Sequence, residues 1–303
     1  MPRLHVLGSG GWVPTPQRQT SCYLLETRRS LIFFDAGTGL SRLHDPLFQR
    51  MLERHSRAVV LLSHWHQDHI EGLHYLPFFL GHMEVVLAAP GDIITGVPAA
   101  ELLERYGGDP FLPEPFSRWP GRFEKGFSVQ EIKPGANKVL GEEIIATVQP
   151  HVGPTLGYRV RDVCYVTDTC VRDETLALAD GVSLLIHDAY LDDEEAERRP
   201  ELAQVHGVAT GAARLAAAGG IKDLLLGHLN PAFDPQRLDR MLIKSCEVFP
   251  RTLLGSDMMV IDVKGAEKEA PSETAVGDDA PDAPAEGAGE KASDDLARAE
   301  PSG

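Results

Sequence analysis

Three histidines and an aspartate fall within six consecutive positions, in the stretch SHWHQDHIEG at residues 63–72. The stretch directly follows the uninterrupted apolar run AVVLL, which predicts a buried strand. In an extended segment residues two apart point the same way, so His64 and His66 can converge on one ion. Asp68 continues this alternation towards a second ion, and His69 comes round as the chain turns into a helix. The cluster therefore predicts a metal site at the end of a buried strand.

The residue types in this cluster indicate what kind of metal site it is. Imidazole and carboxylate groups suit zinc, and manganese or iron can also take them. A structural zinc site normally uses cysteine and closes its shell, whereas this cluster contains no cysteine. HxHxDH after an apolar strand therefore predicts an open, catalytic site rather than a set of solvated loop histidines.

Three further candidate ligands occur later in the chain, each just past the end of a predicted strand. Loops at strand ends present site residues on a rigid scaffold, so this repeated placement supports one shared site. The strands are expected at residues 144–149, 163–167 and 224–227, and the residues that follow them are His151, Asp168 and His228.

The apolar runs of residues 1–264 predict the architecture. Short β-branched or aliphatic runs alternate with turn signals, and residues 40–54 show the apolar spacing of one helix. Residues 107–126 hold four prolines and four glycines, which predicts an irregular loop. The order of strands and helices predicts an α/β fold in which two sheets pack together with helices outside, as one domain.

The acidic charge of the chain is concentrated at its end. Residues 265–303 contain 11 acidic and 3 basic residues, so they contribute −8 of the net charge of −16. This segment lacks aromatic residues and cannot bury enough apolar area to offset its ordering entropy, so we expect a disordered acidic tail. The remaining body is mildly acidic, which argues against extended nucleic acid as a partner.

The cysteines and the hydropathy pattern bear on location. Four cysteines form no CxxC pair and suit a reducing compartment. No apolar stretch approaches the roughly 20 residues that span a bilayer, and the N-terminal residues do not resemble a signal peptide. The expectation is a cytoplasmic protein without a membrane partner.

The combination of these motifs resembles the metallo-β-lactamase superfamily. The resemblance rests on HWHQDH followed in order by His151, Asp168 and His228, and it extends from about Leu4 to Val263. The opening LGSGGWVPTPQRQTSCYLLE and the DAGTG that follows are similar to the ribonuclease Z-like branch, which includes small phosphodiesterases. The resemblance implies a four-layer αββα sandwich with the metal site at one edge of the two sheets.

The same resemblance implies a dinuclear site and a set of ligands. Two divalent ions are expected, zinc or else manganese, sharing a bridging hydroxide that attacks the substrate. The family pattern assigns the first ion to His64, His66 and His151. It assigns the second ion to Asp68, His69 and His228, with Asp168 bridging the pair.

Two residues are expected to take part in catalysis. Asp68, beside the nucleophilic water, can orient it or accept its proton. His206 precedes a helix as a histidine does in the ribonuclease Z-like phosphodiesterases, and we expect it to act as the acid for the leaving oxygen; a helix-entry histidine without chemistry is the alternative. His187 and Asp188 in LLIHDAY are candidates for orienting a ligand imidazole or for an ordinary buried polar pair, and Asp35 is a candidate for orienting a ligand.

Three functions remain open at this point. The expected one is hydrolysis of a small, cyclic phosphodiester, because LLIHDAY and the His206 helix resemble that subgroup and only 16 residues separate His151 from Asp168, leaving no room for the tRNA-gripping arm of ribonuclease Z. A carboxylic ester or thioester hydrolase, of lactonase or glyoxalase II type, would use the same ligands. Ribonuclease Z-type cleavage of RNA ranks behind both.

A non-enzymatic scaffold is the remaining alternative, since some superfamily members have lost their metals. Such members usually lose ligands as well, whereas every expected position is filled here. Members of this branch often form homodimers, so a homodimer is an expectation from the resemblance alone. The sequence shows no interface signature.

Overall fold

The structure is a computed structural model that describes residues 1–108, 112 and 114–263. The acidic tail expected at 265–303 lies outside the described residues, and so does the boundary predicted at residue 264. Across the part of the chain that the structure describes, no helix is long and apolar enough to cross a membrane.

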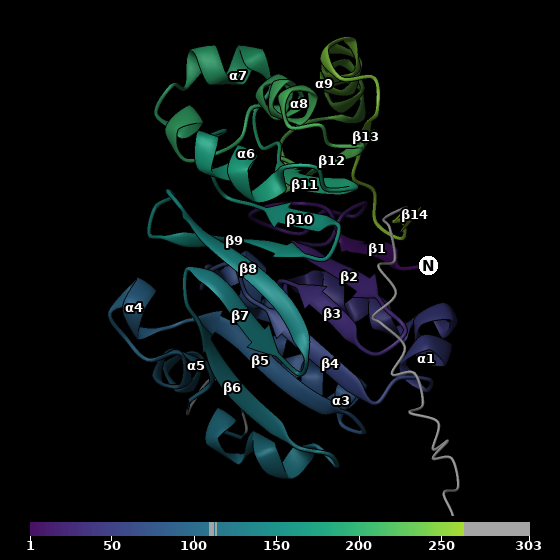
Figure 1. Cartoon of the computed structure of the whole chain (residues 1–303), viewed down its shortest axis with the longest axis vertical. Coiled ribbons are helices and arrows are strands. Elements are labelled where there is room, and N and C mark those ends of the chain that lie inside the picture. Colours follow the sequence, from purple (N-terminus) through teal and green to yellow (C-terminus); the bar gives the residue numbers. More distant parts are fainter. Residues whose placement is uncertain (109–111, 113, 264–303) are drawn as a thin grey trace, which may run out of the picture. The chain divides into compact units, whose positions relative to one another are not determined.

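Within the described residues, two seven-stranded β-sheets form the centre of the molecule (Figure 1). The first has the order β14-β1-β2-β3-β4-β5-β6 and the second β13-β12-β11-β10-β9-β8-β7. The strands of the first sheet are β1 (Arg3–Gly8), β2 (Cys22–Glu26), β3 (Leu31–Phe34), β4 (Arg57–Leu61), β5 (Glu84–Pro90), β6 (Phe127–Ile132) and β14 (Val260–Asp262). Those of the second are β7 (Gly135–Val139), β8 (Glu142–Gln149), β9 (Thr155–Val160), β10 (Val163–Val166), β11 (Leu184–Asp188), β12 (Asp223–Gly227) and β13 (Thr252–Leu254).

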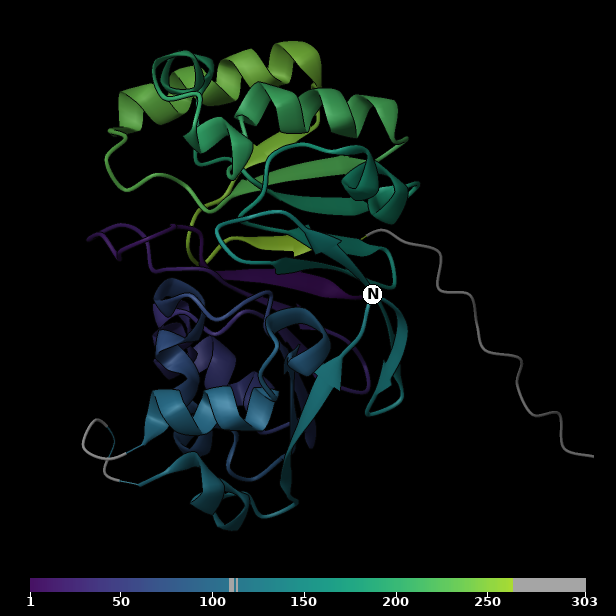
Figure 2. The same cartoon turned by 90° about the vertical axis from the view of Figure 1, so that its left-hand side faces the viewer.

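Helices cover the outer face of each sheet (Figures 1 and 2). The helices between strands of the first sheet are α1 (Pro46–Leu52), α2 (Gln67–Ile70), α3 (Leu76–Leu80), α4 (Asp92–Thr95) and α5 (Ala99–Gly107), with the 3-10 helices η1 (Thr38–His44), η2 (Glu71–Tyr75) and η3 (Phe116–Arg122). Those of the second half are α6 (Asp173–Ala179), α7 (Asp193–Arg198), η4 (Leu202–Gln204), α8 (Ala209–Ala218) and α9 (Pro235–Val248). The expected αββα sandwich is confirmed.

Three apolar layers hold these elements together, and the central strands of each sheet are buried on both faces. Tyr23, Phe34 and Tyr158 belong to the core between the sheets. Phe33 contributes to the layer under the first set of helices, and Leu185 to the layer under the second. Burial on both faces accounts for strands that read as continuous apolar runs.

Strand β4 illustrates this arrangement and carries the chain into the histidine cluster. Ala58 and Val60 point into the helix-covered layer, whereas Val59 and Leu61 point between the sheets. All four side chains are fully buried. The apolar run before the cluster therefore reflects a central strand whose two faces both lie in a core.

The carboxyl ends of the parallel strands meet at one edge of the molecule. Strands β3, β4 and β5 are parallel to one another in the first sheet, and β10, β11 and β12 are parallel in the second. The sheets are joined at this edge where Tyr158 Oη donates to the Leu62 carbonyl at 2.5 Å and Leu156 N donates to the Ser63 carbonyl at 2.9 Å. Residues that follow these strands are thereby collected at one place.

Some local expectations were wrong. The single helix expected at 40–54 is split into η1 and α1, because the Asp45 carboxylate caps α1 at Leu47 N (2.8 Å) and Pro46 occupies its first turn. The segment 107–126 contains the 3-10 helix η3, whose Trp119 is buried. Strand β7, with mostly exposed polar residues, gave no apolar pattern to predict it.

Replacing Leu61 by alanine tests the double burial of β4. We expect Leu61→Ala to lower the free energy of unfolding by about 2–5 kcal/mol, because it removes a fully buried side chain from the core between the sheets. Leu47→Ala is the matched control, since 43% of Leu47 is exposed, and it should change stability by less than about 0.5 kcal/mol. Urea unfolding measures both; equal effects would contradict this account of the core.

Candidate metal centre

The histidine cluster forms a compact turn at the end of β4. His66 has extended backbone angles (φ −70°, ψ 151°) and stands at the start of the short helix α2. The rings of His64 and His66 lie 4.4 Å apart, and those of His64 and His69 lie 4.3 Å apart. The alternation expected from the sequence therefore brings the first two imidazoles together, and the turn into α2 returns His69 beside them.

The three distant candidates join this cluster. His151 follows β8, Asp168 follows β10 and His228 follows β12, each past the end of its strand. Asp168 and His228 have positive φ angles of 50° and 52°. Non-glycine residues with such angles are uncommon and concentrate at functional sites. All seven residues predicted as ligands thus occupy one edge.

One group of donor atoms consists of three histidines. His64, His66 and His151 each offer a nitrogen atom, and these atoms lie within 4.8 Å of one another. His151 Nε2 is 3.3 Å from His66 Nδ1. His64 Nε2 is buried and has no hydrogen-bond partner. A divalent cation among these atoms would satisfy nitrogen atoms that otherwise face each other.

A second group lies next to the first and contains carboxylates. Asp68, His69 and His228 also offer atoms within 4.8 Å of one another. Asp168 lies between the groups: its oxygens are 3.0 Å from His69 Nε2, 3.3 Å from His228 Nε2 and 3.6 Å from His151 Nε2. The first group offers three imidazole nitrogens, and the second offers two imidazoles and one carboxylate. With the Asp168 carboxylate between them, these donors fit two divalent ions.

In three of these imidazoles, the nitrogen that points away from the other donor atoms is Nδ1, and it contacts the surrounding protein. His64 Nδ1 lies 2.9 Å from Ser63 Oγ, and His151 Nδ1 donates to the Val205 carbonyl at 3.0 Å. His69 Nδ1 donates to Asp35 Oδ2 at 2.6 Å. Such partners set the tautomer and orientation of a metal-binding imidazole, leaving the other nitrogen for the ion. Each of these rings therefore presents Nε2 to the site.

The carboxylate of Asp35 contacts residues of both sheets. It is fully buried and accepts from Ser63 N (2.7 Å), Ser63 Oγ (2.8 Å), His69 Nδ1 and Tyr165 Oη (2.5 Å). Ser63 and His69 follow β4, whereas Tyr165 belongs to β10 of the other sheet. Asp35 thus contacts the candidate ligand His69, as expected of a carboxylate that orients a ligand imidazole.

His206 lies against the second group, held by Asp188. Its Nδ1 donates to Asp188 Oδ2 at 2.9 Å. Its ring stacks on Tyr190 at 4.6 Å and on His228 at 5.5 Å. The side chain keeps 13% of its surface exposed, so the imidazole is not closed off from solvent.

His187 and Asp188, expected as an equivalent pair, differ in position. Asp188 approaches His206 and also lies 3.8 Å from His228 Nδ1. His187 Nδ1 lies 2.8 Å from the Asp188 carbonyl, and its Nε2 has no hydrogen-bond partner. The structure therefore gives His187 no contact that orients a candidate ligand.

The loop after β1 reaches the site, and the sequence does not indicate the backbone amide that it contributes there. Trp12 N donates to Asp68 Oδ2 at 2.8 Å, while 70% of Trp12 is exposed. Gly11 lies so close to His228 that an added Cβ would come within 2.6 Å of its ring. A backbone amide can donate whatever its side chain is, so the residue types do not indicate this contact. The glycines of the loop indicate only a turn.

Burial lowers the pKa of a histidine and nearby carboxylates raise it, and the balance differs among the histidines of this site. Burial lowers the pKa of His64, His66 and His151. Burial also disfavours charge on His69 and His228, but the surrounding carboxylates outweigh it, raising the pKa of His69 and bringing that of His228 to about 10. The pKa values of Asp68 and Asp168 are lowered, because these imidazoles outweigh the effect of burial.

Comparison with known proteins identifies the family. The model of the beta-lactamase superfamily domain matches residues 30–229. Ribonuclease Z of Methanosarcina acetivorans is 24% identical over 87% of this chain and 98% of its own. Among solved structures, the metallo-beta-lactamase fold protein YhfI from Bacillus subtilis has a TM-score of 0.66 at 20% identity, covering 86% of this chain and 100% of that one. A diphosphatase from the PhnP family gives 0.61 at 16%, covering 87% and 98%.

The chain belongs to the beta-lactamase superfamily, as a metal-dependent hydrolase with the metallo-β-lactamase fold. The resemblance stated from the sequence is confirmed, including its ribonuclease Z-like character. A divalent metal requirement follows from the family, and the donor atoms described above fit such ions.

Metal binding should release protons. The raised pKa of His69 and the pKa of about 10 for His228 favour the protonated imidazoles in metal-free protein, and a coordinating nitrogen must give its proton up. We expect a net release of protons on saturation with Zn²⁺, and weaker binding as the pH falls because protons compete better. Calorimetric titration in buffers of different ionisation enthalpy measures this release; a value near zero would contradict the protonation assigned here.

Asp35→Asn should weaken metal binding. The substitution keeps the shape of the side chain but removes the charge that faces His69 Nδ1, and we expect Zn²⁺ affinity to fall about 10- to 100-fold. Asp239→Asn, at an exposed position of α9, is the matched control. Competition with a chromogenic chelator measures both affinities. Equal affinities would show that Asp35 does not act through His69.

Proposed function

We propose that this protein is a dinuclear metal-dependent phosphodiesterase. In this proposal His64, His66 and His151 hold one ion, Asp68, His69 and His228 hold the other, and Asp168 bridges them. The support is the grouping of their donor atoms into two adjacent sets with Asp168 between them. Zn²⁺ is the expected metal, with Mn²⁺ as the second candidate, because the set consists of imidazole and carboxylate without thiolate.

The observation that carries the phosphodiesterase proposal is the position of His206. Asp188 holds its Nδ1, the rings of Tyr190 and His228 stack on it, and Asp168 Oδ1 lies 4.0 Å from the same nitrogen, so the imidazole is fixed beside the second group of donor atoms. Cleaving an unactivated phosphodiester expels an alkoxide, which needs a proton. An ester hydrolase has less need of such an acid, so the placement of His206 favours cleavage at phosphorus.

The proposed reaction distributes its protons between two side chains. When bound, the ions would supply charge stabilisation at the phosphate and lower the pKa of the attacking water. The water oxygen forms a new bond to phosphorus while the bond to the leaving oxygen breaks. Asp68, oriented by the Trp12 amide, accepts the proton of the water, and His206 donates one to the departing alcohol.

The substrate class is open to RNA as well as to small diesters. The relatives named ribonuclease Z favour an RNA phosphodiester, and the expectation that extended nucleic acid is no partner finds no support in these relatives. The fold favours a small substrate, because β9 and β10 are joined directly by the turn at Arg161 and Asp162, without an inserted arm. We propose a small cyclic phosphodiester as the substrate and RNA cleavage as the second candidate.

A variant at His206 tests the function. His206→Asn keeps a donor towards Asp188 but cannot deliver a proton, so we expect kcat on 2′,3′-cyclic AMP to fall about 10²- to 10⁴-fold. Hydrolysis of bis(p-nitrophenyl) phosphate should fall less, because nitrophenolate leaves without a proton, and hydrolysis of a lactone should change little.

The controls separate this proposal from its competitors. His74→Asn, at an exposed position of η2, should leave all rates unchanged. Wild-type protein loaded with Zn²⁺ or Mn²⁺ is assayed on the same diesters, on a tRNA precursor with a 3′ trailer, and on S-lactoylglutathione. Thioester or lactone turnover without phosphodiester turnover would overturn the proposal, and metal analysis showing no bound ion would exclude it together with every metal-dependent alternative.

A further inference from the structure

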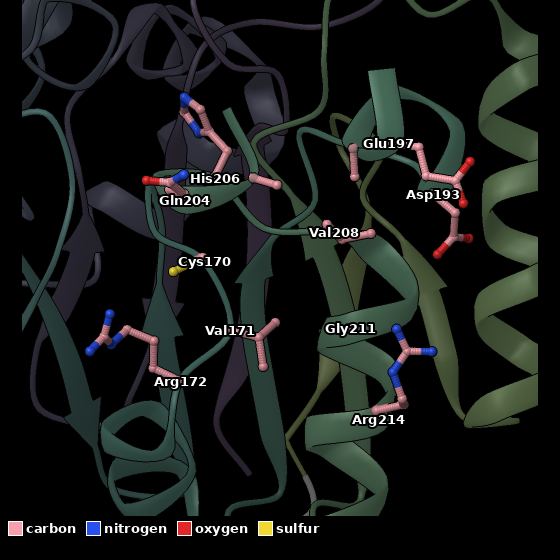
Figure 3. Close-up of a pocket in the computed structure, with 12 residues that line it drawn as sticks. Cys170, Val171, Arg172, Asp193, Glu197, Gln204, His206, Val208, Gly211 and Arg214 are labelled. Carbon is pink, nitrogen blue, oxygen red and sulfur yellow. The ribbon is translucent and has the colours of Figure 1, made fainter. Parts of the chain in front are cut away.

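A cavity of about 720 Å³ lies beside α8 and has His206 in its lining (Figure 3). In this view the ring of His206 points away from the other lining residues, among them Arg172 and Arg214. The ring therefore does not connect this cavity to the candidate ligands. The loop between β1 and β2 does reach them.

This loop, residues 9–21, supplies none of the candidate ligands but contacts two of them. Trp12 N donates to Asp68 Oδ2 at 2.8 Å, and Gly11 packs against the ring of His228. Figure 2 shows the loop, in purple, extending from the edge of the sheets. The conformation of the loop therefore bears directly on the second group of donor atoms.

The backbone at Trp12 is held in an unfavourable conformation. Its φ angle is 65°, and Val13 N donates to the Gly11 carbonyl at 2.8 Å, which closes a three-residue γ-turn. A γ-turn with a positive φ at its centre is rare and strained, and such strain persists only where surrounding contacts over-determine it. The direction of the Trp12 amide thus depends on the contacts that hold the loop.

Asp257, in the turn between β13 and β14, supplies such contacts at both ends of the loop. Its Oδ1 accepts from Ser9 N at 3.0 Å and from Ser9 Oγ at 2.9 Å, and its Oδ2 accepts from Gln19 N at 2.7 Å. Arg42 Nη2 donates to Oδ2 at 3.2 Å and balances the charge. Only 4% of the side chain is exposed, so the carboxylate relies on these donors rather than on water. Asp257 therefore joins the beginning and the end of the loop.

The turn that carries Asp257 is itself fixed to β1. Met258 N donates to the Val6 carbonyl at 2.8 Å, and Val6 N donates to the Met259 carbonyl at 2.9 Å. The carboxylate is thus placed by the strand from which the loop departs. A shift of the loop away from β1 would break hydrogen bonds to a charged group, which are stronger than those between neutral groups.

We propose that Asp257 is a positioning residue for Asp68, the base of the proposed reaction. By holding Ser9 and Gln19 it fixes the strained turn at Trp12, and the Trp12 amide in turn orients the Asp68 carboxylate. The inference rests on the proposed function and names the residue that sets the geometry of its base.

Asp257→Asn in Zn²⁺-loaded full-length protein tests this role. The amide keeps the shape of the side chain, but its NH₂ group cannot accept from Gln19 N. We expect kcat to fall about 10- to 100-fold while KM changes less than about 2-fold, because a displaced base impairs attack and not substrate binding. The loss should be the same on 2′,3′-cyclic AMP, bis(p-nitrophenyl) phosphate and a lactone, since each needs the attacking water. The loss in His206→Asn, by contrast, should depend on the leaving group.

The Trp12 amide gives a readout that does not depend on turnover. The chain has three tryptophans, so protein labelled with α-¹⁵N-tryptophan shows three backbone amide signals, and Trp12→Phe assigns the one of interest. In Asp257→Asn we expect the Trp12 amide to exchange with solvent about 10-fold faster, while the amides of Trp65 and Trp119 keep their rates. A general loss of stability would instead accelerate all three, and that result would overturn the proposal.

Glu142→Gln is the matched control. Glu142 is also a buried carboxylate, with 6% of its side chain exposed, and it accepts from Ser30 Oγ at 2.6 Å and from Arg161 Nη2 at 3.1 Å. It stands at the start of β8, whose other end leads to His151. We expect this variant to change neither kcat nor the exchange of the Trp12 amide. An unchanged kcat or Trp12 amide in Asp257→Asn, or equal effects in the control, would overturn the proposal.

Failure of this positioning role is distinct from failure of the proposed function. Lactone turnover that falls in Asp257→Asn, in a protein that hydrolyses no phosphodiester, would leave the positioning role standing and overturn the proposed reaction. Phosphodiester hydrolysis that does not respond to Asp257→Asn would overturn the positioning role and leave the reaction standing.

Discussion

The buried carboxylate of Asp35 is the contact on which the site depends. It receives hydrogen bonds from the residues after β4 and from Tyr165 of the opposite sheet, so it joins the two sheets at the edge where the candidate ligands lie. A buried carboxylate is unfavourable unless its oxygens are well satisfied, and here four donors satisfy them. The position of His69 is therefore set by the same contact that fixes one sheet against the other.

Most of the site could be predicted from the sequence because its signals are local. HxHxDH after an apolar strand implies convergence, and His151, Asp168 and His228 each mark the end of a strand that is apolar enough to recognise. The sandwich follows from strands whose two faces are both buried. These features depend on residue type and spacing, which a sequence displays directly.

The features that the sequence did not predict depend mostly on contacts between distant segments. The Trp12 amide reaches Asp68 across 56 positions, and a backbone group has no residue code. Tyr165 reads as one more apolar strand residue, although its hydroxyl completes the shell of Asp35. The prediction of one helix at 40–54 was wrong for a different reason. The apolar spacing continues across Pro46, but this proline begins a new helix.

Gly11 packs against the face of His228 with no space for a side chain, while its neighbours Trp12 and Val13 are largely exposed. At the rim of the site, position 11 therefore has no room for a side chain. The side chains at positions 12 and 13 are not constrained by packing. Efforts to redesign the selectivity of this enzyme should keep glycine at position 11 and randomise positions 12 and 13. Diversity introduced there alters the entrance while the imidazoles of the candidate metal centre keep their positions.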